Sequence, residues 1–172
     1  TTPPEGRWLV LTPSSVEVPA GIPAGFEVRT ATDTSRAGLA RLLADGEAAG
    51  VVSLLSLADE GTATGGLFAT VHLVQALPKG VPLWIVTRGA VSAAPGDDVP
   101  NPGQAAQWGL GRVLAAERPD AWGGLVDVVD LDALTWLPTA VAGDEDELAL
   151  RAGRAWTRRI RPAPAPPTPG RW

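Results

Sequence analysis

Pro82-Leu-Trp-Ile-Val-Thr-Arg-Gly-Ala90 holds an unbroken apolar run between a proline and a glycine. A short apolar run bounded by turn-forming residues indicates a strand that is buried on both faces, as in a parallel sheet. The segment Gln104-Ala-Ala-Gln-Trp-Gly-Leu-Gly-Arg-Val113 follows it with helical character, and Trp122-Gly-Gly-Leu-Val-Asp127 then begins another apolar strand. A strand, a helix and a second strand in this order predict an α/β fold built on a parallel sheet.

The rest of the chain repeats this alternation, so the predicted fold class is a Rossmann-like parallel sheet flanked by helices. We predict a truncated version, because the Pro- and Gly-rich segment 13–25 stands where a full Rossmann unit has its first crossover helix. Strands are predicted at residues 7–12, 26–30, 51–57, 83–87 and 124–129, helices at 34–49, 62–77 and 103–118, a weak helix interrupted by Pro138, and a closing hairpin or edge strand with its partner at 147–151 and 155–160.

Length and composition predict one globular domain. The 172 residues, 45% of them hydrophobic, suffice for a sizeable core. We expect this domain at residues 1–161 and a proline-rich, semi-rigid linker at 162–172. The formal charge of −5 and the pI near 4.8 argue against a nucleic-acid-binding face. We expect neither a membrane span nor a signal peptide, and therefore a cytoplasmic protein.

The residue types that carry most enzyme chemistry are scarce in this chain. It has no tyrosine, no cysteine, one lysine (Lys79) and one histidine (His72). The nearest match to a dinucleotide-binding glycine motif is Gly109-Leu-Gly111, which lies inside a predicted helix and has Leu114 at the third glycine position. We therefore expect no catalytic residue, no bound cofactor and no metal site in this chain. His72 is interpreted as a packed or interface histidine.

Two acidic groups are also interpreted structurally. Asp127, Asp130 and Asp132 bracket the end of a predicted strand, where carboxylates often gather in doubly wound folds. The run Asp144-Glu-Asp-Glu147 lacks the alternating ligand spacing of a calcium loop, and a solvated turn before the hairpin is the preferred interpretation.

One face of the predicted helix 103–118 carries mostly small residues. Ala105, Gly109, Arg112 and Ala116 share this face. A glycine within a helix costs about 1 kcal/mol relative to alanine, so a retained glycine indicates a place where another backbone comes near. We predict a tight helix–helix contact at this face, with Trp108 as a buried aromatic anchor of the interface.

Several segments, in the order of the chain, resemble one known family. The resemblance is to the structural, non-catalytic subdomain of the ketoreductase domain in modular type I polyketide synthases, and it extends from Gly6 to Trp172. In that family this subdomain is a degenerate copy of the catalytic subdomain, which follows it in the same polypeptide, either directly or after an inserted enoyl reductase. The segments that carry the resemblance are 51–57, 72–77, 83–90, 107–112, 117–120 with 122–126, and 148–153.

The resemblance implies that this chain is a scaffold for an enzyme of antibiotic biosynthesis. The activity implied for the parent domain is NADPH-dependent reduction of a β-ketoacyl thioester tethered to an acyl carrier protein. Trp108 falls where the catalytic subdomain has its tyrosine, and Thr87-Arg88 falls where it has its serine. Neither an indole nor an arginine can replace the lost proton donor. The helices 62–77, with His72, and 103–118 are expected to meet the catalytic subdomain.

Two other functions compete with the scaffold. A free-standing, cofactor-free α/β protein that binds a small ligand or a partner is the alternative. A self-sufficient reductase is contradicted by the absence of tyrosine.

Overall fold

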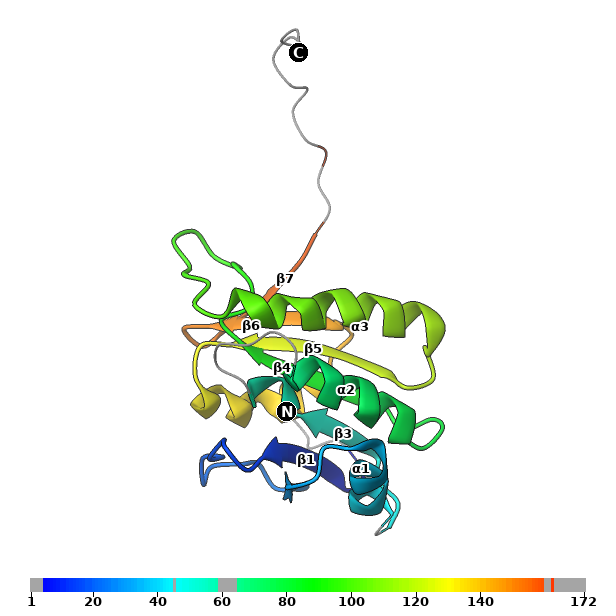
Figure 1. The fold of residues 1–172 in the computed structure, drawn as a ribbon. Helices are drawn as coiled ribbons and strands as arrows, with labels where there is room; N and C mark the ends of the chain where they lie inside the picture. The colour runs from blue at the N-terminus through cyan, green and yellow to red at the C-terminus, as the bar shows by residue number, and fades with distance from the viewer. Residues whose placement is uncertain (1–4, 45, 59–64, 160–161, 163–172) are drawn as a thin grey trace, which may run out of the picture.

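The computed structural model describes residues 5–44, 46–58, 65–159 and 162, which form a sheet with helices on both faces (Figure 1). The predicted linker lies outside these residues, except for Pro162. In the described chain, seven strands lie in the order β2-β1-β3-β4-β5-β6-β7, and every neighbouring pair is parallel except β6 and β7. The strands are β1 (Trp8–Pro13), β2 (Phe26–Ala31), β3 (Gly50–Ser53), β4 (Leu83–Arg88), β5 (Trp122–Val128), β6 (Glu147–Arg151) and β7 (Arg154–Thr157).

The longer helices cover one face of the sheet and shorter helical segments cover the other (Figure 1). On the first face lie α1 (Arg36–Leu43), α2 (Gly65–Ala76) and α3 (Ala105–Glu117). On the second lie η3 (Leu131–Trp136) and α4 (Leu137–Val141). Each helix in the described residues is too short or too polar to cross a bilayer.

Two hydrophobic clusters fill the space between the layers, one on each face of the sheet. Leu9 and Leu11 of β1 and Ile85 of β4 point toward the long helices, whereas Val10 and Trp84 point to the other face. Successive residues of a strand face opposite sides. Burial on both faces is therefore the reason for the continuous apolar runs, and it confirms the predicted parallel sheet.

The connection between β1 and β2 is a loop, as predicted. In residues 14–25 no helix forms, and Val16, Val18 and Ile22 pack from this loop against the cluster around Trp84. The hydroxyl of Thr12 donates a hydrogen bond to the carbonyl of Val16 at 3.1 Å, which holds the start of the loop. The chain thus returns to the sheet without the usual crossover helix.

Two predicted elements end earlier than expected. The strand predicted at 51–57 ends at Ser53, whose hydroxyl accepts a hydrogen bond from the amide of Leu55. The chain then forms the 3-10 turn η1 (Leu55–Leu57), which is buried like a strand although it is not one. The helix predicted at 34–49 ends at Leu43, before Gly46, which has a φ of 107°. Periodicity predicted which residues are buried, but not where the backbone turns.

The helix α3 (Ala105–Glu117) starts later than predicted. The helix predicted from residue 103 opens with the 3-10 turn η2 (Pro102–Gln104), and α3 begins at Ala105. The helix predicted at 62–77 begins at Gly65 in the structure, and residues 62–64 lie outside the described residues.

The closing hairpin is confirmed as β6 and β7. A two-residue turn joins the strands, with φ of 47° at Ala152 and 71° at Gly153. Positive φ at both central residues is typical of a type I′ hairpin turn, whose twist matches that of the strands. Arg151 is paired with Arg154 directly beside this turn.

Candidate functional site

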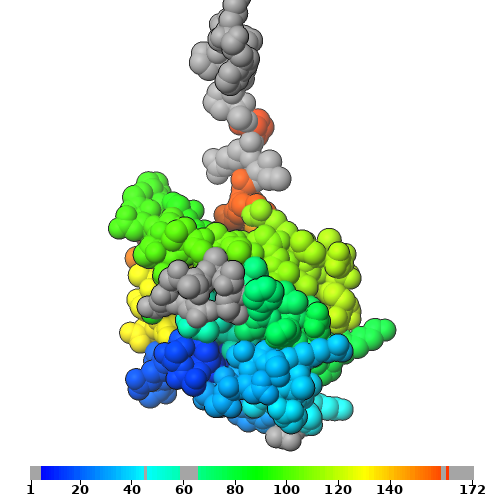
Figure 2. Space-filling view, in the orientation of Figure 1, coloured from blue at the N-terminus to red at the C-terminus, as the bar shows by residue number. Residues whose placement is uncertain are grey.

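The outer surface of α2 and α3 is where the sequence predicts a partner. The helices α1, α2 and α3 share one side of the molecule (Figure 2). The structure turns Ala105, Gly109, Arg112 and Ala116 of α3 outward, so these four predicted residues share an exposed surface. We call the surface formed by these residues, Phe68 and Val113 the α2–α3 face.

The two glycines of α3 have different environments. A Cβ added to Gly111 would lie 2.6 Å from Cδ1 of Leu125 and 2.7 Å from the ring of Trp122, so this glycine lets the helix approach the sheet. A Cβ added to Gly109 would meet no atom within 4 Å. Packing within the described chain therefore explains Gly111 but not Gly109, although both weaken the helix by about 1 kcal/mol relative to alanine.

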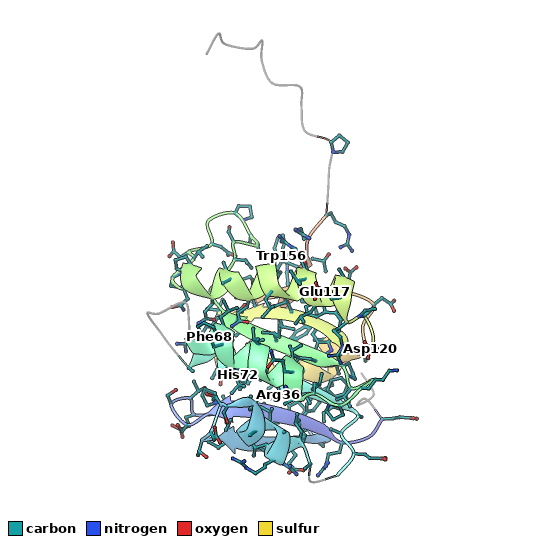
Figure 3. All side chains as sticks on the ribbon, turned by 45° about the vertical axis from the view of Figure 1, so that its right-hand side comes forward. Arg36, Phe68, His72, Glu117, Asp120 and Trp156 are labelled. Atoms are coloured by element: carbon teal, nitrogen blue, oxygen red, sulfur yellow. The ribbon has the colours of Figure 1, made fainter. Side chains whose placement is uncertain are left out.

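Large apolar side chains are exposed on the same face. Phe68 of α2 is 61% exposed and Val113 of α3 is 49% exposed. Figure 3 shows Phe68 projecting from α2 one turn before His72. The sequence of α2 is apolar on nearly all sides, and a helix of this kind is normally buried. When such a helix lies at the surface of a domain, one of its apolar side chains must be exposed, and here that side chain is Phe68.

His72 is half-buried at the edge of this face. Its Nδ1 lies 3.0 Å from the carbonyl oxygen of Thr34, which precedes α1. His72 thus links α2 to the start of α1. Its place at the interface with the catalytic subdomain stays a prediction.

Trp108 corrects one part of the predicted interface. Its side chain is 8% exposed and packs in the cluster between α3 and the sheet, so it does not project from the α2–α3 face. The indole Nε1 donates a hydrogen bond to Oγ1 of Thr87 at 3.1 Å. The physical reason is helical phase, because Trp108 lies at the border of the buried side of α3, together with Gly111, and its ring packs toward the sheet.

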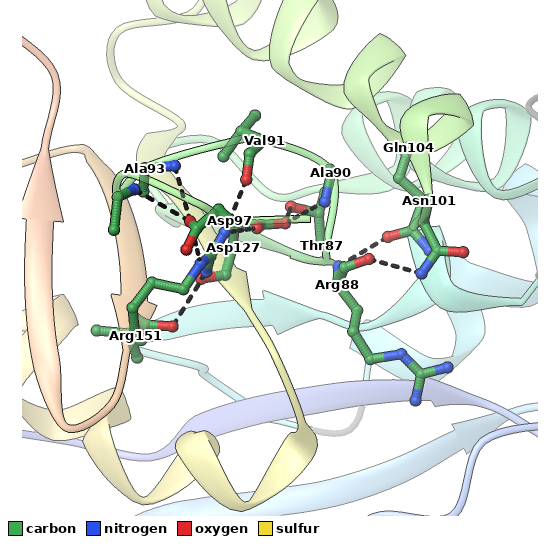
Figure 4. Close-up of polar contacts among 12 residues, drawn as sticks. Thr87, Arg88, Ala90, Val91, Ala93, Asp97, Asn101, Gln104, Asp127 and Arg151 are labelled. Carbon is green, nitrogen blue, oxygen red and sulfur yellow. Dashed lines mark hydrogen bonds and ion pairs between the residues drawn. The ribbon is translucent and has the colours of Figure 1, made fainter. Parts of the chain in front are cut away.

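Thr87 and Trp108 belong to a buried polar network at the carboxyl ends of β4, β5 and β6. Figure 4 shows Thr87, Asp127 and Arg151 within this network. The hydroxyl of Thr87 donates to Oδ1 of Asp127 at 2.6 Å, and the amide of Ala90 donates to the same oxygen at 2.9 Å. Asp127 is fully buried, and Arg151 donates to its Oδ2 at 2.6 Å. The sequence placed Asp127 at a strand end but did not predict its partner.

Arg151 holds the loop between β4 and α3 as well. Its guanidinium donates to Asp97 at 2.8 Å and to the carbonyl of Val91 at 2.8 Å. Burial alone would lower the pKa of Arg151, but hydrogen bonds to Asp127 and Asp97 outweigh this effect and raise it. Hydrogen bonds from the amides of Ala93 and Ala94, together with Arg151, hold the pKa of Asp97 below its ordinary value. Both groups are therefore charged at neutral pH.

The polar groups of Thr87 and the backbone of Arg88 are engaged within this network. The hydroxyl of Thr87 is used by Asp127 and Trp108, and the backbone amide and carbonyl of Arg88 are bonded to Gln104 and Asn101 (Figure 4). Catalytic proton transfer needs a group of matched pKa that can reach the substrate. These side chains serve to join three strands and a loop.

The end of β1 does not fit a dinucleotide. A pyrophosphate in a Rossmann fold is bound by backbone amides at the start of the helix that follows this strand. In this structure β1 ends at Pro13, which has no amide hydrogen, and the loop that follows packs onto the sheet. The residues present therefore do not fit the NADPH that the resemblance implies for the parent domain.

Comparisons with known proteins agree with this fold. Residues 7–160 match the family described as the Rossmann fold domain of the polyketide synthase extender module SpnB. The chain is 38% identical to polyketide synthase GfsA of Streptomyces halstedii, with 95% of this chain and 3% of GfsA covered. It is 40% identical to the pikromycin polyketide synthase component PikAIII of Streptomyces venezuelae, with 92% and 11% covered. The chain thus spans a small part of these relatives.

Solved structures give the same result at the level of the domain. A structure of an A1-type ketoreductase superposes with a TM-score of 0.82 at 38% identity, over 97% of this chain and 40% of that one. The first ketoreductase of the tylosin polyketide synthase superposes with a TM-score of 0.75 at 32% identity, over 93% and 40%. The chain therefore belongs to the SpnB-type Rossmann fold domains of polyketide synthases and is a domain of the ketoreductase region.

Proposed function

We propose that this chain is a non-catalytic scaffold that stabilises the catalytic subdomain of a polyketide synthase ketoreductase in the same polypeptide. The observation that carries the proposal is the α2–α3 face, where Phe68 and Val113 are exposed and Gly109 has open space above it. Phe68 and Val113 lie on two helices that cover the same face of the sheet, and exposed large apolar side chains gathered on one side of a soluble domain indicate an interaction site. A glycine with nothing near it in its own chain leaves room for the backbone of a partner.

The coverage of the solved ketoreductases supports a two-part arrangement. This chain corresponds to 40% of the A1-type ketoreductase chain, so that protein has a further, larger part. In the proposal, that part supplies the NADPH site and the catalytic residues. The parent domain then reduces a β-ketoacyl thioester carried by an acyl carrier protein, while this chain contributes stability and no chemistry.

The substitution Gly109→Leu tests the interface, because its expected effect on the free energy of unfolding has opposite signs in the isolated chain and in the intact ketoreductase. Gly109→Leu in the isolated chain meets open space and improves helix propensity, so it should stabilise that chain by about 1 kcal/mol. In the intact ketoreductase the added side chain should clash with the catalytic subdomain and destabilise the joined protein by roughly 1–3 kcal/mol. Urea denaturation of both proteins measures the two changes.

Ala40→Leu provides the matched control. Ala40 is exposed on α1, away from α3, and leucine should change stability little in either protein. If Gly109→Leu stabilises the intact ketoreductase as it does the isolated chain, the α2–α3 face does not contact the catalytic subdomain and the proposal fails.

A further inference from the structure

The outermost strand of the sheet beyond β6 has an open edge. Among the described residues, β7 pairs with β6 alone. Arg154, Ala155 and Trp156 are exposed, unlike the buried residues of β1 and β4. An open edge presents unpaired backbone groups that another strand can bind.

The opposite edge of the sheet, β2, carries charges of both signs that are bonded to one another. Arg29 on this strand is bonded to Glu27 at 2.7 Å and to the carbonyl of Leu42 at 2.6 Å. Arg7 also reaches Glu27, so charged and mutually bonded side chains crowd that edge. The two edges of the sheet therefore differ in charge, because β2 carries bonded charges of both signs and β7 carries an arginine without an opposite charge on the same strand.

The phase of the hairpin decides which backbone groups of β7 face outward. In a two-residue hairpin the residues beside the turn exchange hydrogen bonds, and such pairs alternate along an antiparallel ladder. Arg154 and Trp156, opposite Arg151 and Ala149, therefore bond to β6. The amide and carbonyl groups of Ala155 and Thr157 point to the open edge.

A hollow of about 270 Å³ lies beside this strand, between β7 and α3. Trp156, which is 37% exposed, lines this hollow together with Trp108 and Val91. Figure 3 shows Trp156 next to α3. A volume of this size accommodates one or two large side chains, not a helix.

One side of β7 is positively charged, although the chain as a whole is acidic. Alternate residues of a strand share a side, so Arg154, Trp156 and Arg158 form one row. Arg158 and Arg112 share a single carboxylate, Glu147, at 2.9 Å and 3.5 Å. Arg154 has no ion pair within the described chain.

The neighbouring carboxylates, which directly precede β6, already have partners within the chain. Glu145 pairs with Arg159, and Asp146 accepts a hydrogen bond from the indole of Trp122 at 2.8 Å. The row along β7 therefore keeps an excess of positive charge on either side of an exposed aromatic ring.

We propose that the open edge of β7 binds an extended segment of another polypeptide as an eighth strand. The segment carries an apolar side chain that enters the hollow beside Trp156 and acidic side chains two residues before and after it, opposite Arg154 and Arg158. Backbone hydrogen bonds to Ala155 and Thr157 provide affinity, and the hollow and the arginines provide specificity. This proposal does not depend on the α2–α3 face, with which the hollow shares Arg112 alone.

A synthetic peptide tests the proposal on the 172-residue chain. The probe is acetyl-Ser-Glu-Thr-Leu-Thr-Glu-Ser-amide, and the readouts are NMR shift titration and amide hydrogen exchange. We expect saturable binding, with the amides of Ala155 and Thr157 exchanging at least five-fold more slowly when the peptide is bound. Two further peptides are N-methylated at alternate residues, one at the odd positions and one at the even positions. Only one of these two peptides should bind, because only alternate amides of the peptide face β7.

Two pairs of variants separate the edge from the rest of the surface. Trp156→Ala and Arg154→Glu should weaken binding at least five-fold. The controls Phe68→Ala, an exposed aromatic residue on α2, and Arg36→Glu on α1 should not change it.

Three results would overturn the proposal. One is a lysine-for-glutamate peptide that binds as well as the probe. The second is binding without protection of Ala155 and Thr157. The third is a set of shifted signals confined to the α2–α3 face, which would reject the β7 site while leaving the proposed scaffold function intact.

Discussion

Arg151 at the end of β6 donates a hydrogen bond to Asp127 in β5 over 2.6 Å, and the two side chains are 8% and 0% exposed. This ion pair lies at the carboxyl end of the sheet, where Rossmann enzymes keep their reacting groups. Here it also fixes the loop between β4 and α3 through Asp97 and Val91. A position suited to chemistry is thus occupied by a structural contact.

Removal of one partner from this pair should be severe. Arg151→Met leaves Asp127 charged and buried, so we expect a loss of about 3–5 kcal/mol in the free energy of unfolding. Arg41→Met breaks the exposed pair with Asp33 and should cost less than about 1 kcal/mol. Urea denaturation of both variants checks the difference. Equal losses would mean that the buried pair is not a principal support of the fold.

Stability should fall in acid because of Asp97. The pKa of Asp97 is lowered in the folded protein by the amides of Ala93 and Ala94 and by Arg151. A carboxyl of this kind stabilises the fold above its unfolded pKa of about 3.9, and the stabilisation disappears as the pH falls through the lower, folded pKa. The Tm should therefore fall more steeply from about pH 5 to about pH 2 in the wild type than in Asp97→Asn. Asp98→Asn, at the exposed neighbour, should keep the wild-type slope.

The isolated chain should not bind NADPH. Pro13 and the loop after β1 provide no helix start for the pyrophosphate. A fluorescence titration with NADPH should give a linear, non-saturating signal, while the intact ketoreductase serves as the positive control. Saturable binding with a micromolar Kd would contradict the assignment of the cofactor site to the other subdomain.

The isolated chain should also self-associate through the α2–α3 face. Phe68→Glu places a charge at its most exposed apolar residue and should shift the sedimentation profile toward monomer. Val129→Glu is the matched control, since Val129 is 60% exposed on a different part of the surface and should leave the profile unchanged. A monomeric wild-type chain, or an equal effect of the two variants, would remove this face as the site of association.

The hairpin turn offers a stabilising change. Ala152 has a φ of 47°, a left-handed conformation that costs an alanine roughly 1–2 kcal/mol. Asparagine tolerates this conformation, and Asn-Gly is the preferred pair in type I′ turns. Ala152→Asn should raise the free energy of unfolding by about 0.5–1 kcal/mol. Ala24→Asn, in an exposed loop position without positive φ, should have no comparable effect in the same thermal melt.

Part of the site could be predicted from the sequence. The exposed stripe of Ala105, Gly109, Arg112 and Ala116 follows from helical spacing alone, because residues three and four apart share a face. The prediction of Trp108 as an interface anchor is wrong, because periodicity alone does not decide whether a residue at the border of two helix faces packs against the sheet or against a partner. The sequence also carries a signal for Phe68. The helix α2 is apolar on nearly all sides, so at least one of its apolar side chains must be exposed if the helix lies at the surface of the domain.

The sequence by itself determined the parallel sheet, the missing crossover helix and the closing hairpin, because local patterns of apolar residues, proline and glycine decide these features. Tertiary structure alone decided that Asp97, Asp127 and Arg151 meet, and that β7 lies at an open edge beside a hollow. Their positions lie 24 to 54 residues apart in the chain, so no local spacing connects them. Burial makes the contact obligatory, because a charge removed from water is stable only where the fold brings an opposite charge and hydrogen bonds to it.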